Sequence, residues 1–145
     1  MTIAMYKKVL AVADLADERS SINVLDTAIR QLAPDGDLGI VAVLEDPGAP
    51  YFPHIPRHSP TERLTSARRE LDRLAAERLP QSVQTRIRVL RGGAGPALVK
   101  AAKADQAELV ILPESYRRAR LGALHGPAHY VGVHAPCAVL FVRNE

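Results

Sequence analysis

Histidine, cysteine and serine are the residues of this chain best suited to metal binding or catalysis. His125 and His129 are four apart and His134 follows, but no carboxylate or cysteine completes a set of ligands, so we expect no metal site. Cys137 precedes an apolar run and is expected to be a buried, unreactive thiol. Ser115 has no Gly-x-Ser-x-Gly motif around it. The sequence therefore predicts no catalytic residue and a protein that is not an enzyme.

Two charged features have the chemistry to contact a sugar or a phosphate. Asp14 ends an apolar run, where a carboxylate accepts hydrogen bonds either from a ligand or from the backbone of the following turn. Arg117, Arg118 and Arg120 form a basic run whose guanidinium groups suit phosphate, although a solvated surface loop is the favoured interpretation. Residues 93–95, Gly-Ala-Gly, lack the third glycine of a dinucleotide-binding loop, and we interpret them as a turn.

Apolar runs and helical patterns alternate along the chain, which is typical of parallel strands joined by covering helices. Strands are predicted at residues 8–13, 38–44, 84–90, 108–112 and 138–142, and the alternating third strand is expected at the margin of the sheet. Helices are predicted at 21–32, from 59–62 through 75, around 98–102 and at 127–133. A turn is predicted at 33–36, and the prolines between 46 and 60 predict a long surface loop.

Composition narrows the classes of protein that fit this chain. A length of 145 residues suits one domain, 1–145, with a core of its own. A single cysteine favours a reducing compartment, and the sequence has no apolar run of about 18 residues that would span a membrane. We therefore expect a cytoplasmic protein. The net charge is only +3 and aromatic residues make up 4%, so nucleic-acid binding, which commonly uses stacking aromatics on a basic surface, is not favoured.

Three segments resemble the universal stress protein family, and the resemblance extends over essentially the whole chain. Residues 7–14, Lys-Lys-Val-Leu-Ala-Val-Ala-Asp, resemble its first strand. Residues 107–111 resemble the entry to its fourth strand, and residues 134–142, His-Ala-Pro-Cys-Ala-Val-Leu-Phe-Val, resemble its closing strand. The resemblance implies an α/β fold with a five-stranded parallel sheet of order 3-2-1-4-5, helices on both faces, and a homodimer paired through the fifth strand. The fifth strand would also leave an apolar edge of the sheet uncovered in a monomer, which independently favours a homodimer.

Nucleotide-binding members of that family hold phosphate with a glycine, two residues, a second glycine, nine residues and then Gly-Ser or Gly-Thr. The same spacing falls on Pro113, Tyr116, Gly126 and Pro127 here. Bulky side chains obstruct the close approach of phosphate to backbone N–H groups, and proline has no N–H to donate. The resemblance therefore implies a stress-response or signalling module with weak or absent ATP binding, no required cofactor and an unidentified protein partner.

The expected ligand crevice lies beyond the carboxyl ends of strands one and four, where the chain connections diverge. Asp14, which matches the family aspartate that faces adenine and ribose, should lie nearest to it with Val43, Gly92 and Gly126. The alternative is an ATP- or AMP-binding member with slow hydrolysis. In that case Arg117 and its neighbours hold the phosphates in place of the missing glycines.

Overall fold

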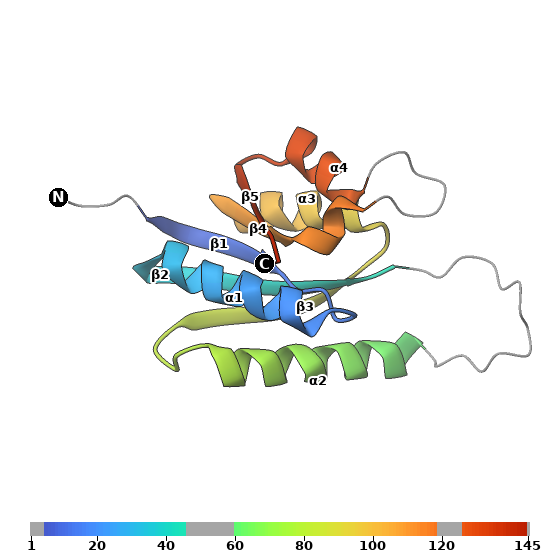
Figure 1. Ribbon diagram of the computed structural model, residues 1–145, viewed down its shortest axis with the longest axis horizontal. Helices are drawn as coiled ribbons and strands as arrows, with labels where there is room; N and C mark the ends of the chain where they lie inside the picture. The colour runs from blue at the N-terminus through green and yellow to red at the C-terminus, as the bar shows by residue number, and fades with distance from the viewer. Residues whose placement is uncertain (1–4, 46–59, 119–125, 145) are drawn as a thin grey trace, which may run out of the picture.

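Five parallel strands form one sheet in the computed structural model, which describes residues 5–45, 60–118 and 126–144 (Figure 1). The strands are β1 Tyr6–Val12, β2 Leu32–Leu44, β3 Gln84–Arg91, β4 Leu109–Pro113 and β5 Ala138–Val142. The helices are α1 Glu18–Gln31, α2 Pro60–Arg78, α3 Ala94–Asp105 and α4 Pro127–His134, and Glu114–Arg117 form a short 3-10 helix, η1. The sheet order β3-β2-β1-β4-β5 confirms the predicted topology.

Helices cover both faces of the sheet, as predicted, because the inner strands present apolar side chains on both faces (Figure 1). Val9 and Ala11 of β1 belong to the core beneath α1 and α2. Leu10 and Val12, one residue on, belong to the second core beneath α3 and α4. Within the described ranges, no helix combines the length and apolar character needed to cross a membrane.

The segment around α1 differs from the prediction at both ends. The helix begins at Glu18 rather than at residue 21, because the Asp17 carboxylate accepts a hydrogen bond from the Ser20 N–H at 3.1 Å and caps the first turn. The prediction of a turn at 33–36 that separates the helix from the next strand is wrong, because these residues already belong to β2. Tyr6 pairs with Leu32 and Lys8 pairs with Asp37. Between these two pairs β1 moves on by two residues and β2 by five, so the extra residues form a bulge within β2.

The connection from β3 to α3 also differs from the prediction. Gly92 has a φ of +110°, which a residue with a Cβ rarely adopts, and it forms the turn. The helix then begins at Ala94, so Gly95 and Pro96 lie in its first turn instead of in a loop. Proline is tolerated there because the N–H groups of the first turn have no partner within the helix. The predicted position of β3 at the sheet margin is confirmed.

Apolar side chains are exposed on β5 and on α4. Phe141 is 38% exposed on β5, and Val133 is 63% exposed on α4. Cys137 was predicted to be buried, but it is only half-buried. Its partial burial raises the pKa of its thiol. The proline-rich segment 46–59 and residues 119–125, which include Arg120 and His125, lie outside the described residues.

Candidate functional site

A cavity of about 270 Å³ lies at the carboxyl ends of the inner strands, where parallel sheets commonly bind ligands. Its lining comes from the residues that follow β1, from the end of β2, from α2 and from η1. The lining residues are Ala13, Asp14, Leu15, Ala16, Val43, Leu44, Glu45, Arg63 and Tyr116. Two of the predicted site residues, Asp14 and Val43, therefore share this cavity.

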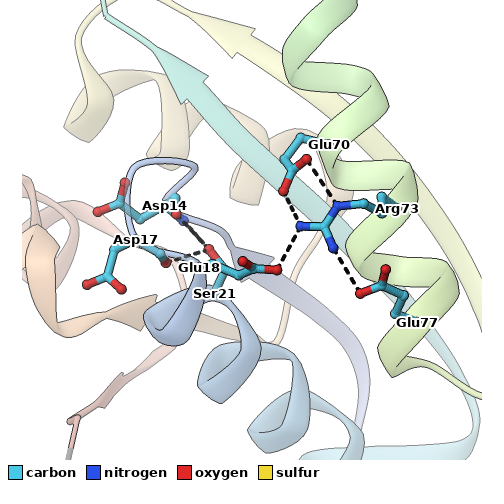
Figure 2. A network of polar contacts seen from close by, with 7 residues as sticks. All are labelled: Asp14, Asp17, Glu18, Ser21, Glu70, Arg73 and Glu77. Carbon is cyan, nitrogen blue, oxygen red and sulfur yellow. Dashed lines mark hydrogen bonds and ion pairs between the residues drawn. The ribbon is translucent and has the colours of Figure 1, made fainter.

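Asp14 stabilises the turn that borders the cavity. Its Oδ1 accepts a hydrogen bond from the Ala16 N–H at 3.0 Å. The Asp14 N–H donates to Ser21 Oγ at 2.9 Å, and that hydroxyl in turn donates to the Asp14 carbonyl oxygen at 2.7 Å (Figure 2). The structure thus shows the local backbone role that the sequence allowed, on a carboxylate that also borders the cavity.

Asp17 follows in the same turn and is held as a carboxylate. The hydrogen bond from the Ser20 hydroxyl, and then the one from the Ser20 N–H, hold the pKa of the Asp17 carboxyl below its ordinary value. The nearby positive charges of Arg118 and Arg19 act in the same direction. Arg118 therefore lies within electrostatic reach of the turn between β1 and α1.

The start of α1 is also tied to α2 through Arg73 (Figure 2). The Arg73 guanidinium donates to Glu18 at 2.7 Å and to Glu77 at 2.9 Å, and it also pairs with Glu70. The hydrogen bond from Arg73 lowers the pKa of Glu70 below its ordinary value, and the three carboxylates raise the pKa of Arg73 above its ordinary value. The guanidinium is partly exposed, so the network orients two helices more than it stabilises the fold.

Three predicted site residues do not line the cavity. The Gly92 N–H donates to the carbonyl oxygen of the lining residue Leu44 at 3.2 Å, which places Gly92 one contact away. Arg117 is an exposed residue at the end of η1. Gly126 precedes α4 as its N-cap, and a Cβ added there would lie 2.6 Å from the Arg117 carbonyl oxygen and would overlap the Arg118 oxygen.

The residues at the spacing of the phosphate signature have structural roles. Pro113 is the last residue of β4, and Tyr116 is 4% exposed and fills part of the cavity wall. The space that the absent Gly126 side chain leaves is taken by the backbone of residues 117 and 118. Close main-chain approach does occur at Gly126, but the approaching group is the protein's own chain.

Arg63 is a lining residue that sequence reasoning missed. Its guanidinium donates to the Glu45 carbonyl oxygen at 3.2 Å, which ties α2 to the end of β2. The helical pattern places Arg63 only near the solvated face of α2, so no sequence signal marked it. The described lining residues thus include two carboxylates, those of Asp14 and Glu45, and one guanidinium, that of Arg63.

A second cavity, of about 560 Å³, lies at the opposite end of the sheet. It is open and polar, and is lined by Lys8, Asp37 and Arg86, among others. Ligands of parallel sheets bind at the loops that follow the strands. The described residues of such loops line the smaller cavity, so we assign the candidate site to it. Within the part of the chain that the structure describes, no three His, Cys, Asp or Glu side chains gather to hold a metal ion.

Solved structures share this fold over nearly their full length. A universal stress protein in complex with cAMP is 18% identical, with a TM-score of 0.66 and coverage of 98% of this chain and 100% of that one. A universal stress protein family member from Burkholderia pseudomallei is 22% identical, with a TM-score of 0.65 and coverage of 97% and 98%. A family protein from Arabidopsis thaliana with AMP bound is 11% identical, with a TM-score of 0.62 and coverage of 96% and 92%.

At these identities the structural likeness shows the fold alone, and no curated protein sequence matches the chain significantly. Sequence evidence of family membership comes instead from the profile of the universal stress protein family, which matches residues 5–143. That match starts at the entry to β1 and continues past the end of β5, so it includes every strand and the cavity residues between them. The chain therefore belongs to the universal stress protein family.

Proposed function

We propose that this protein is a dimeric stress-response or signalling module, without enzymatic activity, that binds adenine nucleotides weakly or not at all. The observation that carries the proposal is the loss of backbone donors where phosphate would approach. Pro113 and Pro127 have no N–H, and Tyr116 presents a large buried side chain to the cavity. At Gly126, carbonyl groups of the preceding segment occupy the space next to the backbone.

The size and charge of the cavity support the same proposal. Ligand pockets commonly have volumes of about 300–1,000 Å³, and the described cavity has about 270 Å³. A triphosphate brings several negative charges, whereas the described part of the lining contributes two carboxylates and one guanidinium. Like charges at short range oppose binding, and Arg63 already donates to the Glu45 carbonyl. The crevice thus offers little compensation for the lost backbone donors.

The second candidate is an ATP- or AMP-binding protein with slow hydrolysis. Relatives crystallised with cAMP and with AMP motivate it, as does Arg118, whose charge reaches Asp17 beside the cavity. In this case Arg117 and Arg118 supply the charged donors that the signature lacks. Both candidates use the same crevice and differ in what holds the phosphates.

Calorimetric titration separates the two candidates. Wild-type protein, purified without added ligand and checked for co-purified nucleotide, is expected to show no micromolar affinity for ATP or AMP, since the signature backbone donors are absent. Micromolar affinity would contradict the proposal.

The variant Arg117→Ala/Arg118→Ala then tests the second candidate: it should weaken binding by roughly 2–4 kcal/mol if both guanidinium groups make desolvated charged hydrogen bonds. An unchanged affinity in that variant would exclude this role for the arginines.

The dimer is proposed to form through β5. Among the described strands β5 pairs with β4 alone, so within that part of the chain its other edge offers unpaired backbone groups beside exposed Phe141. Phe141→Lys is expected to convert the protein to monomers at micromolar concentration, because a charged side chain at this exposed position is costly once a second copy covers the apolar edge. Sedimentation velocity measures this change. Thr85→Lys, on the exposed β3 margin at the other side of the sheet, is the matched control and should leave the dimer intact. A monomeric wild type would contradict the proposed dimer.

A further inference from the structure

Asn144, two residues beyond the end of β5, connects the tail of the chain to two distant elements, η1 and α1. Its backbone N–H donates to Glu114 Oε2 at 2.8 Å. Its side-chain Nδ2 donates to Ser20 Oγ at 2.7 Å, and its Oδ1 accepts from Asn23 Nδ2 at 2.9 Å. These partners are 30, 124 and 121 residues away in sequence. We call Asn144, Asn23, Ser20, Asp17 and Glu114 the Asn144 network.

The side-chain hydrogen bonds of the network run in one direction toward a charge. The Asp17 carboxylate only accepts, so the Ser20 hydroxyl must donate to it, at 2.7 Å. Because the only hydroxyl hydrogen of Ser20 is used in that bond, its oxygen accepts from Asn144 Nδ2. Asn144 Oδ1 in turn accepts from Asn23 Nδ2. Such a chain polarises each bond in turn and ends on the carboxylate whose pKa is held low. Ser20 is 0% exposed, so losing a partner there leaves a buried polar group.

The network reaches two walls of the candidate crevice. On one side, Glu114 begins η1, two residues before the lining residue Tyr116. On the other, Ser20 and Asp17 begin α1, and the adjacent Ser21 hydroxyl holds the backbone of the lining residue Asp14. Asn144 itself follows the sheet edge at which the dimer is proposed. The tail after β5 is therefore hydrogen-bonded to residues that adjoin two walls of the crevice.

We propose that Asn144 is a positioning residue of the crevice, and that it transmits to the crevice whether β5 is paired with a second copy of this chain. This rests on the dimer of the proposed function. A paired β5 holds the tail where Asn144 meets Ser20 and Glu114, whereas an unpaired edge strand frays more readily. Coupling is reciprocal, so a crevice that is held in place also favours pairing of β5.

Hydrogen exchange of backbone amides, resolved by NMR, tests the proposal. Asn144→Ala removes both side-chain bonds and keeps the backbone N–H, and it should speed exchange of the Asp14 and Ser20 amides by about tenfold, as expected for local opening after loss of hydrogen bonds. Exchange in the core of β1 should not change, which separates local repositioning from global destabilisation. Arg143→Ala, at the exposed neighbouring position in the same tail, is the matched control and should change neither.

The coupling is tested with the dimer variant. Phe141→Lys should speed exchange of the same two amides, and the double variant Phe141→Lys/Asn144→Ala should add nothing beyond Asn144→Ala. Additive effects would overturn the coupling, and unchanged exchange in Asn144→Ala would overturn the positioning role. If wild-type protein sediments as a monomer, the proposed dimer and its coupling both fail, while the single Asn144 variant still decides the positioning role. A failure of nucleotide binding affects neither readout.

Discussion

Ile111→Ala should lower the free energy of unfolding by about 2–5 kcal/mol. Ile111 is 0% exposed at the middle of β4, where its backbone pairs with Ala11 of β1 and Leu140 of β5. Its side chain belongs to the core beneath α1, which includes Val24 and Leu25. Removing three carbon atoms leaves a cavity that rigid strands on both sides cannot close, so the loss exceeds the transfer free energy of those atoms alone.

Denaturation in urea measures the Ile111 effect. The midpoint should fall while the slope with denaturant stays the same, because the surface exposed on unfolding hardly changes. Val133→Ala, on the exposed outer surface of α4, is the control and should change stability by no more than about 0.5 kcal/mol. A loss below about 1 kcal/mol for Ile111→Ala would mean that the α1 face of the sheet is loosely packed, contrary to the structure.

The strands were predictable because burial on both faces leaves a continuous apolar record in the sequence. Residues 9–12 show this pattern, and their alternate side chains supply the two cores. The start of β2 was not predictable in the same way. Residues 33–36 have turn chemistry, and the register of β1 and β2 shifts at them, but the pairing of Tyr6 with Leu32 places this irregularity inside a strand. Pairing between strands decides where an element begins, and local propensity does not report it.

The candidate site was predicted in part, for a comparable physical reason. Asp14 and Val43 were found because they lie at the carboxyl ends of inner strands, a position that the fold class fixes. Arg63 and Asn144 were not found. Arg63 lies on a helix whose pattern shows which face is buried but not what the other face meets. The side-chain partners of Asn144 are more than 100 residues away on α1, a distance over which no local pattern gives information.

Gly126→Ala should lower the free energy of unfolding by about 1–3 kcal/mol, the range for forcing extra atoms into a packed site. The added methyl would lie 2.6 Å from the Arg117 carbonyl oxygen and would overlap that of Arg118. Both obstacles are backbone atoms, so relief requires a shift of η1 against α4 and not merely a change of rotamer. Alanine is also a poorer N-cap than glycine, which acts in the same direction. Thermal or urea denaturation measures the loss.

Gly132→Ala supplies the matched control within the same helix. A Cβ at Gly132 meets nothing within 4 Å, and alanine in a helix interior is more favourable than glycine by roughly 0.5–1 kcal/mol, so this variant should be slightly more stable than wild type. The same chemical change is therefore expected to have opposite signs six residues apart. If Gly126→Ala were instead neutral, the space beside Gly126 would be open, and the backbone there would again be accessible to a phosphate. The stability of this one variant thus tests whether the protein's own backbone blocks the space beside Gly126, on which part of the proposed function rests.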